Sequence, residues 1–267
     1  MQQPWMSVVV PAYNEELAIG VTLDALREWL DASGRPYEIV VVDNASQDGT
    51  AEVVRRFAQD GNVRLLVNDE NRGKGYSVRR GMLETSGRLR LMCDADCGPS
   101  LASLGRMVEA GREAHVVVGS RLAEGAEVER DQPFRRRLVG WPFIALTRLL
   151  MGESTRDVYC GFKLWHGTAA EAVFPLQTLE GWTFDAEVLA LARRLGFSVR
   201  EEGIVWADRD GSRLSIREVL LPVVRELLSA RRNVRRQRRE ATAPPLALVP
   251  GEPAFPEPAA RTEGAGS

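Results

Sequence analysis

Acidic side chains follow two segments that look like buried strands. Asp43 closes the apolar run Glu38–Asp43, and Asp94 and Asp96 follow the apolar run Arg88–Cys93. Ligands of open α/β sheets bind beyond the carboxyl ends of the strands, so these carboxylates should lie at one edge. Two carboxylates one residue apart can hold one hard cation, Mg²⁺ or Mn²⁺, that bridges to a substrate diphosphate. A solvated turn or a helix cap is the alternative for so short a pattern.

A glycine-rich segment, Asn71–Gly75, precedes a helix predicted from Lys74 to Thr85. Glycine lets the backbone approach a ligand closely, and a helix N-terminus favours anions. The segment is not a Walker phosphate loop, because Gly75 rather than Ser or Thr follows Lys74. No G-x-G-x-x-G follows the first predicted strand either, which argues against a nicotinamide-dependent dehydrogenase. An anion-binding turn and a plain turn both fit the segment.

The elements that must position these groups alternate between strand and helix. Apolar, β-branched runs typical of doubly buried strands alternate with helical spacings such as Leu23, Leu26 and Leu30. This alternation predicts an α/β fold, a mostly parallel sheet flanked by helices. The strands are expected at Ser7–Pro11, Glu38–Asp43, Val63–Val67, Arg88–Cys93, His115–Gly119 and Ser198–Trp206, with a late helix at Phe184–Leu195.

Composition bounds the class of protein. The 267 residues suit one large α/β domain or two small ones, and 44% hydrophobic with 27% charged residues is ordinary for a globular protein. A net charge of −2 does not mark a nucleic-acid binder. Three cysteines, an odd number, are expected as free thiols in a reducing compartment. No apolar run reaches the length of a membrane span, and the N-terminus lacks a secretory leader, so we expect a cytoplasmic protein.

Two segments of the chain are basic and amphipathic. Phe134–Gly152 has four Arg and no acid, and Arg225–Glu240 carries a local charge of +5. An apolar stripe from Ile216 to Leu228 predicts a helix, which Pro222 should kink or restart. We therefore divide the chain into a catalytic domain (1–214) with a basic insert (124–156), a C-terminal helix (215–240) and a disordered tail (241–267).

Such basic helices are typical of proteins that lie in the headgroup plane of an anionic membrane. We expect these amphipathic helices to be interfacial and to attach the protein peripherally to the cytoplasmic face of a membrane. The alternative is that Ile216–Leu228 packs on the domain or on a dimer partner. The sequence gives no oligomeric state.

Eight motifs in order carry a family resemblance. PAYNEE, VVDNASQDGT, NRGKGYSVRRG, CDADCG and GSR resemble the family-two inverting glycosyltransferases of the GT-A fold, a Rossmann-like nucleotide-diphospho-sugar transferase fold. DVYCGFKLW, GWTFDAEVL and VWADRDGSRL are similar to the dolichyl- or polyprenyl-phosphate sugar synthases, in their mannose and glucose branches. The resemblance covers roughly residues 5 to 220 and favours the metal role of the Asp-Ala-Asp turn.

The resemblance implies a donor side of the site. Asp94 should face the nucleotide-sugar, Asp96 should be the main ligand of Mg²⁺ or Mn²⁺, and Asp94 should share that metal. The mannose branch usually carries a Gln where Gly98 stands, so the sequence leans toward the glucose branch. The donor stays open between UDP-glucose and GDP-mannose. The nucleotide pocket is expected to involve Pro11, Tyr13, Glu15, Asp43 and Lys74.

The resemblance also implies an acceptor side. Arg121 and Arg213 should face phosphate groups, with Arg137 as a further candidate, and Asp185 and Glu187 should lie near the sugar or acceptor. A surface salt bridge is the alternative for Arg121. For Asp185 and Glu187 the alternative is that the two acids stabilise a helix N-terminus and have no catalytic role.

Histidine is scarce, which constrains the mechanism. Only His115 and His166 occur, and neither lies in a motif, so a histidine proton relay is not expected. A hydroxyl acceptor would need Asp185 or Glu187 as its base, whereas a lipid phosphate is already an anion. The leading hypothesis is hexose transfer from a nucleotide-sugar to a polyprenyl or dolichyl phosphate, with inversion.

Three other functions stay open. The same fold could glycosylate a soluble hydroxyl acceptor. A sugar nucleotidyltransferase is less favoured, because PAYNEE (Pro11–Glu16) stands where its basic glycine-rich loop is usual. The third is a noncatalytic nucleotide-binding protein, against which the intact acidic motifs argue.

Overall fold

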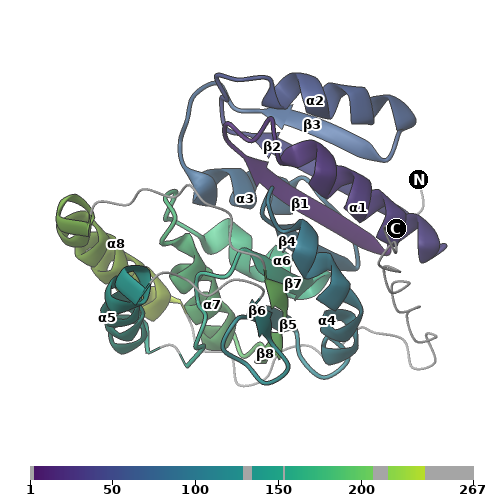
Figure 1. The fold of residues 1–267 in the computed structure, drawn as a ribbon. Helices are drawn as coiled ribbons and strands as arrows, with labels where there is room; N and C mark the ends of the chain where they lie inside the picture. Colours follow the sequence, from purple (N-terminus) through teal and green to yellow (C-terminus); the bar gives the residue numbers. More distant parts are fainter. Residues whose placement is uncertain (1–2, 129–133, 153, 207–215, 238–267) are drawn as a thin grey trace, which may run out of the picture.

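The computed structural model describes residues 3–128, 134–152, 154–206 and 216–237, and is built on one seven-stranded sheet (Figure 1). The strand order is β3-β2-β1-β4-β7-β5-β8, and every pairing is parallel except the two made by β7. The fold class predicted from the sequence is thereby confirmed. The strands of the sheet are β1 (Met6–Ala12), β2 (Tyr37–Asp43), β3 (Val63–Val67), β4 (Leu89–Cys93), β5 (Val116–Ser120), β7 (Phe162–His166) and β8 (Val199–Gly203).

Helices cover both faces of this sheet, and two further helices lie beyond one of them (Figure 1). One face carries α1 (Ile19–Ala32), α2 (Thr50–Phe57) and α4 (Leu104–Ala110). The other carries α3 (Lys74–Leu83), α6 (Gly167–Val173) and α7 (Phe184–Arg194), with α5 (Phe134–Met151) and α8 (Ile216–Arg236) packed beside α7. Short elements complete the fold: η1 (Ala58–Asp60), η2 (Gly98–Ser103), η3 (Phe174–Leu176) and the paired strands β6 (Glu127–Val128) and β9 (Val205–Trp206).

Alternation along the strands builds two hydrophobic cores. In β1, Val8 and Val10 point into the core under α1, whereas Val9 points into the core under α3. All three side chains are fully buried. Each such burial stabilises the fold by about 1.5–3 kcal/mol, which explains the continuous apolar run of this strand.

The central strand β7 was not among the predicted strands. It lies antiparallel between β4 and β5, with Phe162 opposite Cys93 and Lys163 opposite Met92. Its sequence, FKLWH, is short and is interrupted by a lysine, so no apolar run marks it. A strand inserted from a distant part of the chain leaves no local pattern, because its pairing is set by long-range contacts.

Two other predictions are corrected. The strand expected over Ser198–Trp206 is two strands, β8 and β9, separated at Ile204. Of the kink or restart expected at Pro222, the restart is wrong, because one helix runs from Ile216 to Arg236 with Pro222 inside it.

Helix α8 packs on the rest of the fold, against α5 and α7. Val223, Leu227 and Ala230 are buried in the core shared with α7, as the packing alternative for this segment anticipated. No helix within the described ranges combines the length and the apolarity needed to cross a bilayer. The tail 241–267, Arg213 and the side chain of Arg137 lie outside what the structure describes.

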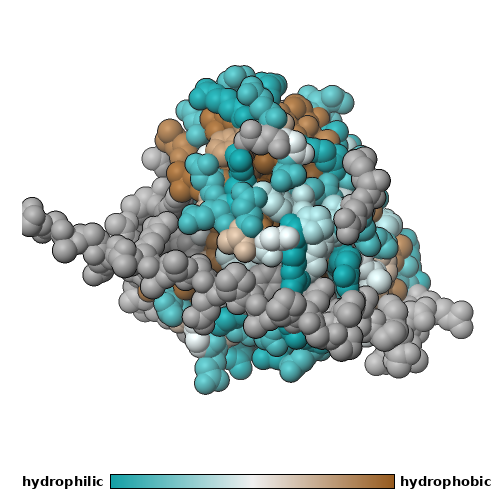
Figure 2. Space-filling model, turned by 90° about the vertical axis from the view of Figure 1, so that its right-hand side faces the viewer, coloured by the Kyte–Doolittle hydropathy of each residue, from teal (hydrophilic) through white to brown (hydrophobic). Residues whose placement is uncertain are grey.

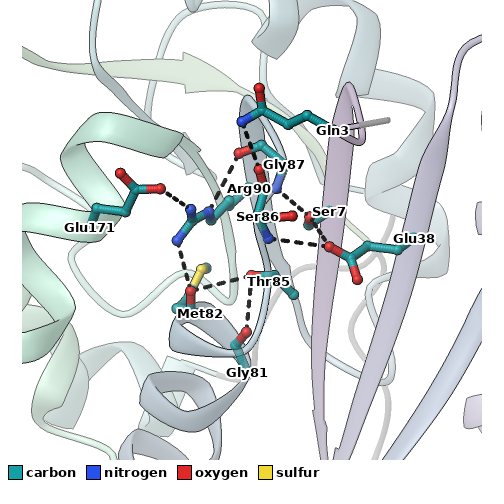
Figure 3. A network of polar contacts seen from close by, with 10 residues as sticks. All are labelled: Gln3, Ser7, Glu38, Gly81, Met82, Thr85, Ser86, Gly87, Arg90 and Glu171. Atoms are coloured by element: carbon teal, nitrogen blue, oxygen red, sulfur yellow. Dashed lines mark hydrogen bonds and ion pairs between the residues drawn. The ribbon is translucent and has the colours of Figure 1, made fainter. Parts of the chain in front are cut away.

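A polar network fixes the amino end of the sheet (Figure 3). The Arg90 side chain, 2% exposed, donates hydrogen bonds to the carbonyl oxygens of Met82 and Gly87 and forms an ion pair with Glu171. The Gly87 amide donates to the Ser7 hydroxyl at 2.8 Å. The network ties β1, β4, α3 and α6 together at the edge opposite the predicted site.

We predict that protonation of His166 destabilises the fold below about pH 6.5. Its Nε2 lies 2.8 Å from the Gly111 carbonyl oxygen, and burial lowers the pKa of His166, assisted by His115 and Arg88. As the pH falls, the unfolded chain therefore takes up a proton before the folded chain does. The contribution of neutral His166 to stability is therefore fully present above the pKa that it has in the unfolded chain. It is lost as the pH falls toward the lower pKa that it has in the folded protein.

The measurement is urea unfolding of the wild type and of His166→Gln, which keeps a donor, at about pH 7.5 and about pH 5.5. The loss of unfolding free energy between the two pH values should be smaller in the variant. An equal loss in both proteins would contradict the prediction.

Candidate active site

A pocket of about 330 Å³ opens at the carboxyl ends of β1, β2 and β4. It gathers nearly all of the predicted donor-side residues, although those that line it come from three separate motifs. The exception is Asp43, which is 2% exposed, accepts a hydrogen bond from the Ser46 amide and is not among the lining residues. The lining residues are Pro11, Ala12, Tyr13, Glu15, Asn44, Asn71, Gly73, Lys74, Ser77, Asp94, Ala95 and Asp96.

Asp94 presents one paired and one unpaired oxygen. Its Oδ2 accepts a hydrogen bond from Lys74 Nζ at 2.7 Å, whereas its buried Oδ1 has no hydrogen-bond partner among the described residues. A buried oxygen without a partner is unfavourable unless a ligand supplies one. Ligand atoms of Asp94, Asp96 and Cys97 lie within 4.8 Å of one another. The two carboxylates thus fit a hard divalent cation.

Cys97 stays a neutral thiol beside these carboxylates. Contact with the Cys93 thiol and burial raise the pKa of Cys97 well above its usual value. All three cysteines are free, in agreement with the sequence analysis. The oxygens of Asp94 and Asp96 are therefore the groups best suited to Mg²⁺ or Mn²⁺.

Asparagines that the sequence analysis missed shape the pocket wall. Asn44 Nδ2 donates to Asn71 Oδ1 at 2.7 Å, and Asn68 Nδ2 donates to Asn44 Oδ1 at 2.9 Å. The Arg72 amide also donates to Asn44. The available signal was position alone, since Asn44 directly follows Asp43 at a strand end. The side-chain oxygens of Asn44 and Asn71 accept hydrogen bonds within the protein, and their amide nitrogens can donate to a nucleoside.

The glycines of the segment before α3 allow backbone to pack on backbone. Gly73 has φ +103°, and a Cβ there would lie 2.5 Å from the Glu180 carbonyl oxygen. The amide of Gly75 donates to the Gly181 carbonyl oxygen at 3.2 Å. The segment that begins α3 is thus held against residues 180–181, which fixes Lys74 at the pocket.

A buried charge network lies behind Lys74. Lys163, fully buried on β7, donates to Asp185 Oδ1 at 2.6 Å, and Asp185 is itself 2% exposed. Burial raises the pKa of Asp185, an effect that Lys163 and Lys74 only partly offset. Burial would lower the pKa of Lys74, but Asp94 and Asp185 outweigh it and raise that pKa. Lys163 was not predicted as a site residue.

Glu187 has a different setting from the one expected. It is fully buried and accepts hydrogen bonds from the amides of Thr178 and Leu179 and from Asn233 Nδ2 of α8. Its oxygens are therefore occupied within the protein and do not face an acceptor. The carboxylate instead anchors the segment that packs on α3.

The Arg121 side chain is paired with an acidic residue of the protein. Its guanidinium forms a two-point ion pair with buried Asp157, at 2.7 and 2.6 Å, and lies 5.2 Å from the ring centre of Trp206. The alternative considered for Arg121 was a surface salt bridge; the structure shows an ion pair with a buried acid instead, and a phosphate would have to compete with Asp157.

We predict that Gly161→Ala displaces Asp94 and weakens metal binding. A Cβ on Gly161 would lie 1.8 Å from Asp94 Oδ2, so the carboxylate must move. Displacing such a group should lower Mn²⁺ affinity by about tenfold to hundredfold, measured by calorimetry in the presence of UDP.

Gly98→Ala is the matched control, because a Cβ there meets only Thr22 Oγ1 at 3.7 Å. Its Mn²⁺ affinity should equal that of the wild type. Unchanged affinity in Gly161→Ala, or an equal loss in both variants, would count against this account of Asp94.

Comparison with known proteins agrees with this arrangement. The family model described as "Glycosyl transferase family 2" matches residues 7–176. A dolichyl-phosphate beta-glucosyltransferase of Dictyostelium discoideum is 32% identical over 224 residues, covering 79% of this chain and 68% of the relative. One from Drosophila melanogaster is 35% identical over 225 residues, covering 79% and 69%.

Solved structures share the fold. Glucosyl-3-phosphoglycerate synthase of Mycobacterium tuberculosis, in complex with Mn²⁺, UDP-glucose and phosphoglyceric acid, superposes with a TM-score of 0.60 at 21% identity, covering 85% of this chain and 79% of that one. S. aureus TarS with UDP-GlcNAc gives 0.54 at 18% identity, covering 84% and 66%. With its GT-A fold and its family match over most of the sheet, this chain belongs to glycosyl transferase family 2.

Proposed function

We propose that the protein transfers glucose from UDP-glucose to dolichyl phosphate, or a related polyprenyl phosphate, with inversion of the anomeric carbon. The observation that carries this proposal is the match, over more than two thirds of their length, to dolichyl-phosphate beta-glucosyltransferases. The small residue Gly98 in the acidic turn agrees with the glucose branch. The GDP-mannose alternative has no support among these relatives.

The pocket residues have distinct tasks in this reaction. Bound at Asp94 and Asp96, Mg²⁺ or Mn²⁺ would supply positive charge to the departing diphosphate. Lys74, charged and held at the pocket wall, can donate to the same diphosphate. Asn44 and Asn71 offer hydrogen bonds to the nucleoside, and Tyr13, 41% exposed, offers a ring face.

The setting of the two proposed bases favours a phosphate acceptor. Asp185 is buried in an ion pair with Lys163, and Glu187 is buried and fully hydrogen-bonded. A hydroxyl acceptor would need one of them to take its proton, whereas a phosphate monoester attacks as an anion. Asp185 is therefore assigned an electrostatic role, and Arg121, if released by Asp157, and Arg213 remain the proposed acceptor-phosphate ligands.

We predict that only one donor and acceptor pair gives a lipid-soluble product. Radiolabelled UDP-glucose with dolichyl phosphate should label the organic phase, and GDP-mannose or a soluble hydroxyl acceptor should not. Chelation should abolish transfer, and Mn²⁺ or Mg²⁺ should restore it.

Asp96→Asn is the inactive control for this assay, because it removes a proposed metal ligand. Transfer to a soluble acceptor, transfer from GDP-mannose alone, or transfer that ignores chelation would each overturn part of the proposal. Release of pyrophosphate would instead indicate a nucleotidyltransferase.

We further propose that α5 and α8, side by side in Figure 1, bring the enzyme to the cytoplasmic face of an anionic membrane. Leu149 of α5 is 76% exposed, and α8 exposes Leu228 beside Arg225, Arg232 and Arg235. The opposite side of the molecule, seen in Figure 2, shows a mostly hydrophilic described surface with hydrophobic residues in separate patches. Exposed apolar and basic groups together suit a headgroup layer.

We predict that neutralising Arg232, Arg235 and Arg236 to Gln weakens binding to phosphatidylserine vesicles by about 3 kcal/mol, since each arginine near the surface adds about 1 kcal/mol. Flotation at low and high salt measures the effect. Arg55→Gln with Arg56→Gln, on exposed α2, is the control. Binding that ignores salt, anionic lipid and the triple substitution would contradict membrane attachment through α8.

A further inference from the structure

Both lysines of the chain meet in one buried network. Only two of the 35 basic residues are lysines, Lys74 on α3 and Lys163 on β7. All the others are arginines, including every basic residue on the exposed helix α8. A lysine carries a compact point charge, whereas arginine carries a planar fork of donors. The use of lysine at these two positions alone suggests a shared requirement for a compact cation.

Lys163 lies in the protein interior, where a charged group needs an oppositely charged partner. Its side chain is fully buried in the central strand β7, and its Nζ lies 2.6 Å from Asp185 Oδ1 and donates to the Cys160 carbonyl oxygen. Burying an ammonium ion costs several kcal/mol unless the partner geometry is good. A hydrophobic side chain at this strand position would avoid the free-energy cost of burying a charge. The presence of lysine therefore implies that the negative charge of Asp185 must be balanced.

Asp185 in turn acts on the donor pocket through Lys74. The two groups interact electrostatically, and Lys74 Nζ is bonded to Asp94 Oδ2 at 2.7 Å. Charges thus alternate from Lys163 through Asp185 and Lys74 to Asp94. Lys74 interacts with two carboxylates, those of Asp94 and Asp185. It forms its ion pair with Asp94, whereas Lys163 forms the ion pair with Asp185.

We propose that Lys163 is a positioning residue of the donor site, which by neutralising Asp185 keeps the Lys74 ammonium on Asp94. Without Lys163, Asp185 would be a buried charge with Lys74 as its nearest remaining partner. Lys74 would then be drawn from the pocket wall toward Asp185. The diphosphate would lose the hydrogen bond that the Lys74 ammonium can donate to it. The inference rests on the proposed function only in taking a nucleoside diphosphate as the ligand of this pocket.

The first test replaces the charge and keeps the length of the side chain, in Lys163→Met. Calorimetry with UDP and Mn²⁺ should show affinity reduced by about tenfold to hundredfold, as for other groups that orient ligand-binding residues. In protein labelled with carbon-13 at lysine Cε, the wild type gives two lysine signals, and the one left in the variant belongs to Lys74. We expect that signal to shift from its wild-type position.

The second test removes the charge that Lys163 balances. In Asp185→Asn there is no carboxylate to draw Lys74 away, so adding Lys163→Met should leave UDP affinity unchanged, although the same change lowers it in the wild type. The melting temperature should rise, because Lys163 has lost its charged partner in Asp185→Asn. The double variant Lys163→Met/Asp185→Asn should bind UDP within a few-fold of the wild type. This comparison does not need the single variant Lys163→Met to fold.

The outcomes are distinct. An unmoved Lys74 signal with unchanged UDP affinity in Lys163→Met overturns the inference, as does a double variant that binds UDP much more weakly than Asp185→Asn. If the wild type binds no UDP, the proposed donor is wrong, and the Lys74 signal still decides the role of Lys163. Failure of glucose transfer to dolichyl phosphate leaves both measurements unaffected.

Discussion

The site depends on charges buried at the carboxyl end of the sheet and on the pairs that make their burial tolerable. Asp185 and Lys163 lie almost wholly inside the protein, and Lys74 and Asp94 form the wall between that interior and the pocket. Removing one member of a buried pair is far more costly than never having built the pair. The four groups therefore constrain one another, and the geometry of the donor pocket follows from that constraint.

Close backbone packing holds these charges in place. Gly73 and Gly75 let the start of α3 rest on residues 180–181, and Glu187 holds the neighbouring residues Thr178 and Leu179. Asn233 of α8 donates both to Glu187 and to the Leu176 carbonyl oxygen. A helix at the outer surface is thereby joined by hydrogen bonds to the segment that seats Lys74. The packing of α8 therefore helps to fix the segment that positions Lys74 at the pocket.

The sequence predicts most of this architecture, because parallel strands buried on both faces leave continuous apolar runs. It also predicts the acidic turn, since ligands of such sheets bind at strand ends. It does not predict β7, whose place between β4 and β5 depends on contacts with distant strands. Lys163 was missed for the same reason, because its partner Asp185 is visible only once β7 and α7 are packed.

Two smaller misses have simple geometric causes. Asp185 and Glu187 were expected near the sugar or acceptor as a pair, but residues two apart on a helix point in different directions. Asp185 accordingly turns to Lys163, and Glu187 turns to the segment before α7. At the end of β2, Asn44 lines the pocket whereas Asp43 does not and accepts a hydrogen bond from Ser46, because neighbouring side chains of an extended chain face opposite sides.

The buried acids also bear on the proposed phosphate acceptor. A base must be able to release its proton to solvent between turnovers, and a carboxylate closed in an ion pair beneath the pocket is poorly placed to do so. An acceptor that arrives as a phosphate brings its own negative charge and needs only cationic groups to hold it near the departing diphosphate. The two lysines have a different part: Lys163 pairs with Asp185 in the interior and Lys74 pairs with Asp94 at the pocket wall.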